Sequence, residues 1–588
     1  MKTPPTYSRF IIRLLALCII LAPAGNAWSQ ITIDGYIVDQ SNSQPLAFVQ
    51  VFSAGGQGTL SNEEGYFMIK VPRLPAELQF QNIGYENLSI KLTETENLLI
   101  QLNPVSYQLN EVQIASKESK LPYKKLWASV AKTRRALLGR EQGKLFLRSQ
   151  TMVDQNMALE QLEAYYNYYI ANGEIDSLTL KAGNLRLPES SYFMNQGLPF
   201  LIRNYKPISE AQSLMPSSPY DLSGWRNIRR WYRVRIVEKI PTASDTLMVY
   251  KFEAKDPQAV FSGTAYIQQS NDVLQELRLH ITDSEQIPFY SLANQSEDAL
   301  DQLSMEIRIA FEGDQRNLRY RLMTYDLQYR IAQARQIHTI ASLWFFKSGS
   351  LFPSPILPID PPLEEYEKLA YFPYDSVFWQ RQPQIPLSST EQAQSATLYS
   401  TRPYDMQQDS GLALMSNRIE YWYPDWQLDT LRVSKTPSLE AKYNILEKSS
   451  LAYEYDSIYA STQLFLDYDC YPDTVIYQIE AVIDYEQSYL IPRDSLSLAF
   501  FDNYLKVTRF HANRMQAMLQ YRFGNECPDP KAIADMYDEV DQTRRQDIAN
   551  YFANLNKKRP KSFKLKISKI ISDRLSESER FANEVPQD

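Results

Sequence analysis

The chain has 588 residues, and 61 lysines and arginines stand against 69 aspartates and glutamates, which gives a formal net charge of −8. This acidic balance argues against nucleic acid as a general partner, because phosphate binding requires a basic surface. The length predicts several domains, and an aromatic share of 12% with 40 tyrosines favours extensive β structure.

The N-terminus has the features of a signal peptide over residues 1–29. Lys2, Arg9 and Arg13 precede an apolar run at 14–22 that is too short to span a bilayer, and small residues follow it. Removal of this segment changes the formal charge to −11. No later run of eighteen apolar residues occurs, so we expect no transmembrane segment after the signal peptide. Export places the mature protein in the periplasm or in association with the outer membrane.

Residues 30–115 are predicted to form a β-sandwich. Short strands with alternating apolar residues are expected at 33–39, 45–51, 66–71, 77–80, 88–92 and 98–102, with turns between them. Glycines 58 and 65 lie in two of these turns, where they are expected to supply positive φ at low steric cost.

The motifs of this stretch resemble, in their order, the carboxypeptidase regulatory-like domain of Bacteroidota envelope proteins. The resemblance rests on Gly-Tyr-Ile-Val-Asp at 35–39, Pro-Leu-Ala-Phe-Val at 45–49, Glu-Gly-Tyr-Phe at 64–67, Ile-Gly-Tyr-Glu at 83–86 and Leu-Asn-Glu-Val at 109–112. In that family the module is a non-catalytic appendage. The resemblance therefore implies adhesion or docking rather than chemistry.

Residues 116–347 are predicted to form a helix followed by an antiparallel meander. Pro122 suits the first turn of a helix over 122–138, and Gly139 suits its end. Alternating strands then recur at hairpin-like intervals from 145 to 346. We expect this sheet to be curved, and we expect it to be the part of the chain that would bind an apolar ligand such as a lipid.

Four tyrosines of the meander, Tyr165, Tyr166, Tyr168 and Tyr169, form a candidate binding surface. Their rings could stack on a glycan, although tyrosines in strands more often face a neighbouring layer. The order of sandwich, helix and meander also resembles a Bacteroidota family of unknown function, whose closing signature is matched by residues 374–379 and 385–388 and by Glu391.

Residues 348–416 are predicted to be a proline-rich linker, because prolines lock φ and withhold hydrogen-bond donors. Residues 417–588 are predicted to form an α+β domain, with strands at 419–422, 452–455, 463–466 and 481–485 and helices at 495–521 and 530–554. Cys470 and Cys527 could form a disulfide in an oxidising compartment, or could remain unpaired, one buried and one exposed.

The C-terminal order of strands and helices resembles a family of secreted zinc peptidases. The helix of that family carries His-Glu-x-x-His, and Phe500, Phe501 and Tyr504 stand at the three matched positions here. Phenylalanine can neither bind zinc nor act as a general base. The resemblance therefore implies a degenerate peptidase fold, and an unrelated strand-and-helix domain is the alternative.

Residues suited to catalysis are few and scattered. His280, His338 and His511 are isolated in the sequence, and no zinc motif or nucleophile elbow occurs. We therefore predict no catalytic residue, no metal site and no cofactor. A basic run at 557–569, interleaved with apolar residues, could contact an anionic lipid surface or an acidic partner, or could be a solvated face.

Together these features predict a mainly β protein, α+β overall, that is exported, non-catalytic and acts in binding or scaffolding in the bacterial cell envelope. Its partner would be an envelope protein, a glycan or a lipid. Two alternatives stay open: a peptidase-like hydrolase in the C-terminal domain and a periplasmic lipid carrier.

Overall fold

The structure is a computed structural model, which describes residues 31–53, 58–105, 107–108, 119–154, 157–187, 216–242, 245–284, 300–331, 335–346, 351–358, 368–369, 372–400, 458–471, 474–490, 495–555 and 561–584. The chain divides into two compact units. Unit 1 is Met1–Val105 with Pro383–Ser388, and unit 2 is Ser106–Gln382 with Ser389–Asp588. Most of the regular structure is β and most strand pairs are antiparallel, which confirms the predicted fold class.

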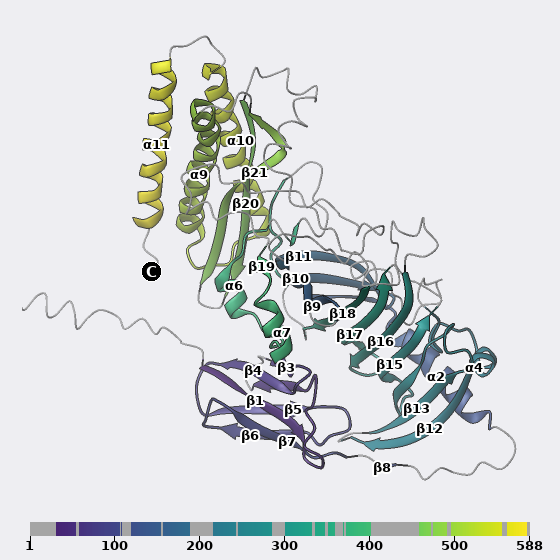
Figure 1. Ribbon diagram of the computed structural model, residues 1–588. Coiled ribbons are helices and arrows are strands. Elements are labelled where there is room, and N and C mark those ends of the chain that lie inside the picture. Colours follow the sequence, from purple (N-terminus) through teal and green to yellow (C-terminus); the bar gives the residue numbers. More distant parts are fainter. Residues whose placement is uncertain are drawn as a thin grey trace, which may run out of the picture. The chain divides into compact units, whose positions relative to one another are not determined.

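Unit 1 consists of two small sheets around one apolar core (Figure 1, purple). One sheet has the order β4 (Tyr66–Val71), β1 (Ile31–Asp39), β7 (Leu98–Leu102), and the other has the order β3 (Gly58–Leu60), β2 (Gln50–Ser53), β5 (Ala76–Gln81), β6 (Leu88–Leu92). Alternate residues of these strands point inward, including Ile33, Ile37, Phe67, Phe80 and Leu102, which are all buried. The predicted sandwich is confirmed.

Two of the motif residues in unit 1 stabilise its turns. The carboxylate of Asp39 accepts hydrogen bonds from the backbone N–H of Ser41 (2.7 Å) and the hydroxyl of Tyr85 (2.8 Å). The hydroxyl of Ser41 donates a further hydrogen bond to this carboxylate (2.6 Å), which is the main reason that the pKa of Asp39 is lowered. Gly65 has φ of 75° and a Cβ there would lie 2.5 Å from a backbone oxygen, as its predicted turn requires. The prediction for Gly58 is wrong, because this residue lies within β3 without positive φ.

Unit 2 is built on one twelve-stranded antiparallel sheet. Its order is β19 (Tyr399–Ser400), β11 (Glu174–Leu187), β10 (Met157–Ala171), β9 (Arg140–Val153), β18 (Arg335–Phe345), β17 (Arg319–Ile331), β16 (Leu300–Glu312), β15 (Leu274–Ser284), β14 (Ser262–Gln268), β13 (Thr246–Ala254), β12 (Tyr232–Pro241) and β8 (Tyr107–Gln108). The pairing of β9 with β18 joins the strands β9 to β11 to the strands β12 to β18 in one sheet. Many of these strands are visibly curved (Figure 1).

The helix predicted at 122–138 is α2 (Leu121–Ala136), which lies beside the short α4 (Trp225–Trp231) against β12 and β15 (Figure 1). Tyr123, Leu126 and Val130 of α2 are buried in the same apolar core as alternate residues of the sheet. The sheet was expected to be the place for an apolar ligand, and one of its faces is covered in part by the protein's own helix.

The predicted linker at 348–416 is wrong for the residues that the structure describes there. Two short helices, α6 (Ser376–Arg381) and α7 (Ser389–Ser395), occur in it, and Phe352, Phe378 and Trp379 are buried. The segment 383–388 belongs to unit 1, where the hydroxyl of Thr59 donates to the carbonyl oxygen of Gln384 (3.0 Å). The prolines separate short docked segments rather than forming an exposed linker.

The C-terminal part of unit 2 is a long hairpin packed against helices. It comprises β20 (Ile458–Cys470), β21 (Val475–Leu490), α9 (Ser495–Phe523), α10 (Pro530–Leu555) and α11 (Lys561–Glu584), and α9 contacts both strands and both other helices (Figure 1). Strands predicted at 419–422 and 452–455 lie outside the described residues. None of the described helices is long and apolar enough to cross a membrane.

Candidate functional site

The tyrosine group that the sequence offers as a binding surface is not a surface. Tyr165, Tyr166 and Tyr168 are buried, and Tyr169 is partly buried. Successive residues of a strand point to opposite faces, so Tyr166 and Tyr168 lie in the core on the α2 side while Tyr165 points the other way. The proposed glycan stacking is therefore corrected: these rings serve packing.

Tyr165 is the centre of an aromatic cluster on the face of the sheet away from α2. Its ring centroid lies 4.9 Å from that of Phe146, 5.2 Å from Phe378, 5.0 Å from Trp379 and 6.1 Å from Phe352. The last three pairs have the edge-to-face arrangement that aromatic quadrupoles favour. Segments 351–358 and 376–381 are thus held on β10 by aromatic side chains.

Two polar contacts position these aromatic segments. Asn167 of β10 exchanges two 2.8 Å hydrogen bonds with the backbone of Phe352. The side chain of Asp375 caps α6, since it accepts from the backbone N–H groups of Val377 (2.8 Å) and Phe378 (3.0 Å). The cap fixes the start of the helix that carries Phe378 and Trp379 into the cluster.

Beside this cluster lies the most unusual group of charges in the described residues, which we call the lysine site: Lys181, Asp467 and Asp469. Lys181 is the unpaired residue of a β-bulge in β11, between Leu180 and Ala182. A bulge re-aims a side chain out of the regular alternation. Here it directs a completely buried ammonium toward β20.

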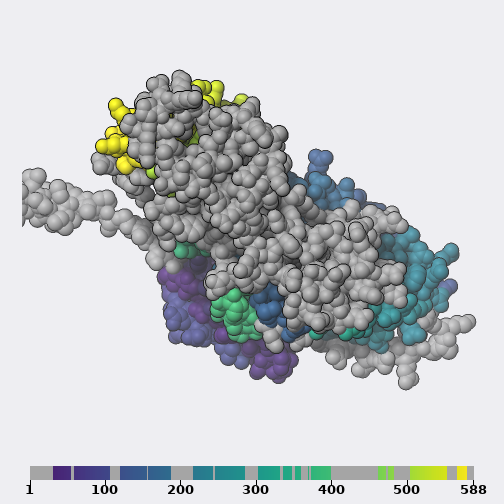
Figure 2. Space-filling model, turned by 45° about the horizontal axis from the view of Figure 1, so that its top comes forward, coloured from purple at the N-terminus to yellow at the C-terminus, as the bar shows by residue number. Residues whose placement is uncertain are grey.

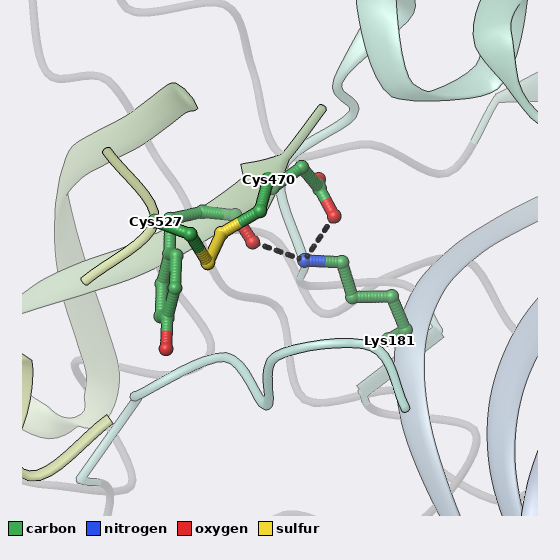
Figure 3. The surroundings of a disulfide bond; sticks show 5 residues. Lys181, Cys470 and Cys527 are labelled. Atoms are coloured by element: carbon green, nitrogen blue, oxygen red, sulfur yellow. Dashed lines mark hydrogen bonds and ion pairs between the residues drawn. A yellow bond between two sulfur atoms is a disulfide. The ribbon is translucent and has the colours of Figure 1, made fainter. Parts of the chain in front are cut away.

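The ammonium of Lys181 has three N–H donors, and β20 supplies three acceptors from consecutive residues. Nζ lies 2.5 Å from Oδ1 of Asp467, 2.9 Å from the carbonyl oxygen of Tyr468 and 3.1 Å from Oδ1 of Asp469. Figure 3 shows the ammonium reaching the strand directly beside the Cys470–Cys527 disulfide. Alternate strand residues share a face, so both carboxylates point at the same lysine.

Burial dominates the electrostatics of this site. It raises the pKa of Asp467 to about 6 and that of Asp469 to about 7, even though the charge of Lys181 favours the ionised forms. Burial also lowers the pKa of Lys144, whose ammonium lies 4.2 Å from the centroid of the Phe352 ring. One lysine and two carboxylates that share protons near neutral pH make a compact, nearly neutral cluster. Its evident capacity is to hold β20 against β11.

The two cysteines of the predicted pair are joined by a disulfide in the structure. Cys470 ends β20 and Cys527 lies between α9 and α10, so the bond ties the hairpin to the helices. The lysine site and the disulfide act on neighbouring residues of one strand. Together they connect the large sheet, the hairpin and the helices.

The three histidines are not brought together. His338 lies 2.8 Å from Asp326, His511 lies 3.0 Å from Asp547, and the two pairs are on different elements. His511 is buried, which lowers its pKa, and its Nδ1 has no hydrogen-bond partner among the described residues. No group of three His, Cys, Asp or Glu residues able to hold a metal ion occurs in the described part of the chain.

The other candidates lie in the C-terminal helices. Phe500, Phe501 and Tyr504 are all on α9; Tyr504 is buried, and the side chains of the two phenylalanines lie outside the described residues. The side chains of much of the basic run at 557–569 are also outside them, but Lys566 and Lys569 are exposed on α11. Some atoms of the yellow C-terminal part are visible at the surface in Figure 2.

Sequence reasoning missed the lysine site and the residues around it. A lysine within an otherwise regular strand and the Asp-Tyr-Asp alternation at 467–469 were the available signals. Each signal is ordinary alone, because strands often present charged residues to solvent. Only their burial against each other makes them notable.

Comparison with known proteins identifies a family for one part of the chain, its N-terminal module. Residues 33–114 match the family model described as the CarboxypepD_reg-like domain, which confirms the predicted N-terminal module. No curated protein matches the chain. The match covers neither the meander nor the C-terminal helices, so the Bacteroidota origin and the peptidase resemblance gain nothing from it.

Two solved structures have weak similarity to the chain. The complex of Pseudomonas aeruginosa MucA and MucB has a TM-score of 0.15 and 9% identity, and covers 37% of this chain and 93% of that one. MucB in complex with MucA(peri) has a TM-score of 0.13 and 8% identity, with the same coverage. Similarity at this level carries no argument about fold or function.

Proposed function

We propose that this chain is an exported, non-catalytic binding or scaffolding protein of the bacterial cell envelope. The N-terminal regulatory-like module would act as the recognition element, and unit 2 would act as a rigid support. The observation that carries the proposal is the Cys470–Cys527 disulfide beside the lysine site. A structural disulfide persists in oxidising compartments, and the signal-like N-terminus agrees with export.

The charges of the lysine site favour a supporting role over chemistry. Lys181 is fully buried and its three donors are engaged by β20, so its amine is unavailable as a nucleophile or base in this arrangement. Asp467 and Asp469 are engaged by the same ammonium. A buried ion cluster that bridges β11 and β20 fixes the geometry of the elements it joins.

The first test is compartment and thiol state. Cells expressing the full chain are treated with a thiol-alkylating reagent before lysis, and Cys470 and Cys527 are examined by mass spectrometry with and without reduction. Protection of both cysteines until reduction, together with recovery in the envelope fraction, supports the proposal. Alkylation of both without reduction, in a cytoplasmic fraction, contradicts it.

The second test separates binding from catalysis. The purified mature protein is analysed for bound metal and assayed for peptide hydrolysis with and without a chelator. Stoichiometric zinc with chelator-sensitive hydrolysis would overturn the non-catalytic proposal in favour of a hydrolase. Stoichiometric lipid in the native mass spectrum would instead favour a lipid carrier.

A further inference from the structure

The lysine site brings an amine and a carboxyl group into direct contact away from water. Nζ of Lys181 lies 2.5 Å from Oδ1 of Asp467, and the two side chains are 0% and 8% exposed. The carboxyl carbon is one C–O bond, about 1.2 Å, beyond that oxygen, so it lies at most about 3.7 Å from the nitrogen. Reacting atoms in a near-attack geometry are about 3–3.5 Å apart. A small movement of either side chain therefore brings the nitrogen and the carbon to reacting distance.

A second carboxyl group contacts the same nitrogen. Oδ1 of Asp469 lies 3.1 Å from Nζ of Lys181. Burial raises the pKa of Asp469 to about 7, although the charge of Lys181 acts against the rise. The charges of Asp467 and Asp375 add to it. A group whose pKa is close to neutrality can both accept a proton and return it at neutral pH.

The carboxyl oxygen that contacts Lys181 also has a backbone donor. The N–H of Tyr468 donates to Oδ1 of Asp467 at 2.8 Å. When an amine adds to a carboxyl carbon, negative charge develops on this oxygen, and a donor already aimed at it stabilises that charge. The three consecutive residues 467–469 thus supply an electrophile, an oxyanion donor and an acid–base group.

The surroundings favour a neutral product over the ion pair. Lys181 is completely buried, and Asp467 and Asp469 are 6% and 5% exposed. Nζ of Lys181 lies 5.5 Å from the centroid of the Phe378 ring, which belongs to the aromatic cluster around Tyr165. Two charges in such a site carry a desolvation cost that an uncharged amide does not.

We propose that Nζ of Lys181 and the carboxyl carbon of Asp467 form an intramolecular amide bond, with Asp469 as the group that transfers protons. Transfer of one proton from the ammonium to Asp469 ends the arrangement in which all three donors are engaged, and leaves a lone pair on Nζ. Nζ then bonds to the carbon, the bond from this carbon to Oδ2 breaks, and Oδ2 leaves as water with two of the three ammonium protons. The third proton stays on the amide nitrogen, so atoms and charges balance without an oxidant or a cofactor.

The amide would join two strands of unit 2 covalently. Lys181 on β11 and Asp467 on β20 are 286 residues apart, and the Cys470–Cys527 disulfide lies directly beside them (Figure 3). Two covalent bonds would then tie the end of β20 to the large sheet and to the helices. This inference goes beyond the proposed scaffolding role and does not depend on it, since the reaction uses only groups of the lysine site.

The test is the mass of the purified mature chain, measured after reduction and denaturation. We expect the mass of the sequence less one water. A tryptic digest should contain one peptide in which the segments around Lys181 and Asp467 are joined, without cleavage after Lys181, because trypsin does not cut after an acylated lysine. An unmodified mass, or a water lost at other residues, overturns the proposal.

The Lys132–Asp272 pair is a matched control for contact without burial. Nζ of Lys132 lies 2.8 Å from Oδ2 of Asp272, but the side chains are 37% and 18% exposed. We expect these two residues to appear in separate tryptic peptides. Lys181→Met should have the full mass of its sequence, whereas Lys132→Met should still lack one water. The same result in both variants contradicts the assignment to Lys181, and if Lys181→Met does not fold, the digest of the unmodified chain decides.

Asp469→Asn tests the proton transfer, because an amide side chain cannot exchange a proton as a carboxyl group does. Cooperative urea unfolding shows that the variant is folded, and we expect most of its freshly purified molecules to keep the mass of the unlinked chain. Complete amide formation would refute the role of Asp469. If the variant does not fold, Asp469→Glu replaces it, since the longer side chain displaces the carboxyl group from Nζ; incomplete linkage supports the role and complete linkage contradicts it.

Discussion

Replacement of Lys181 by methionine is the most direct test of the lysine site. Methionine fills much of the same space, so the change mainly removes the ammonium that bridges β11 and β20. Asp467 and Asp469 are 6% and 5% exposed, and both would lose their contact with this ammonium, at 2.5 and 3.1 Å. Removal of one partner from a buried ion pair leaves an uncompensated charge, which costs about 3–5 kcal/mol.

Lys132→Met is the matched control. Its ammonium lies 2.8 Å from Oδ2 of Asp272, a distance comparable to that in the lysine site, but the two side chains are 37% and 18% exposed. Water screens such a pair, and exposed pairs contribute about 0.2–1 kcal/mol. Contrast between the two variants isolates the effect of burial, since both remove one lysine of an ion pair in the same unit.

The assay is urea unfolding followed by tryptophan fluorescence, because Trp379 lies in the aromatic cluster next to the lysine site. We expect the midpoint of Lys181→Met to fall well below that of Lys132→Met. Equal midpoints for the two variants would refute the reasoning, since they would mean that water reaches the lysine site or that the hairpin does not depend on it. The triple change of Lys181, Asp467 and Asp469 to apolar residues should recover much of the loss.

Three further predictions concern the same region. The pKa of Asp469 is raised to about 7, so the folded protein binds more protons than the unfolded chain and its stability should fall as the pH rises through 7. Asp469→Asn should flatten this pH dependence in unfolding measured from pH 5 to 8. An unchanged slope in that variant would contradict the assignment of the pKa to Asp469. Replacing both Cys470 and Cys527 by alanine opens a loop with a sequence separation of 57 and should cost about 4 kcal/mol in the chain-entropy model, whereas an unchanged thermal midpoint would show that the bond carries no stability. Asp375→Ala should cost about 1 kcal/mol through loss of the α6 cap and Asp375→Ser should recover most of it; equal unfolding midpoints for the two variants would argue against a capping role.

The local structure followed closely from sequence periodicity. The strands expected at intervals between 145 and 346 include β16 and β17, and the helices expected at 495–521 and 530–554 are α9 and α10. These segments repeat apolar residues with the period of a strand or a helix over enough residues to exclude the other. The motif order of the N-terminal module likewise identified its family from local turns alone.

Several elements departed from their local signals for identifiable reasons. The prolines between 353 and 386 suggested a linker, but aromatic residues such as Phe378 and Trp379 pack on Tyr165 and bury the segment. The basic run at 557–569 was interpreted from its charges and interleaved apolar residues, and the structure places its residues from Lys561 onward on α11, which packs along α9. Tertiary burial outweighed local composition in the proline-rich segment.

The sequence alone determined many of the long strands and the helices α2, α9 and α10, because that information lies in neighbours a few residues apart. Only the tertiary structure decided which distant side chains meet. Lys181 and Asp467 are 286 residues apart, and the β-bulge that aims Lys181 exists only once particular strands are paired in register. Burial then decides the chemistry: the same lysine and aspartate side chains would be ordinary solvated charges on an open strand, and they become an ion cluster because water is excluded from them.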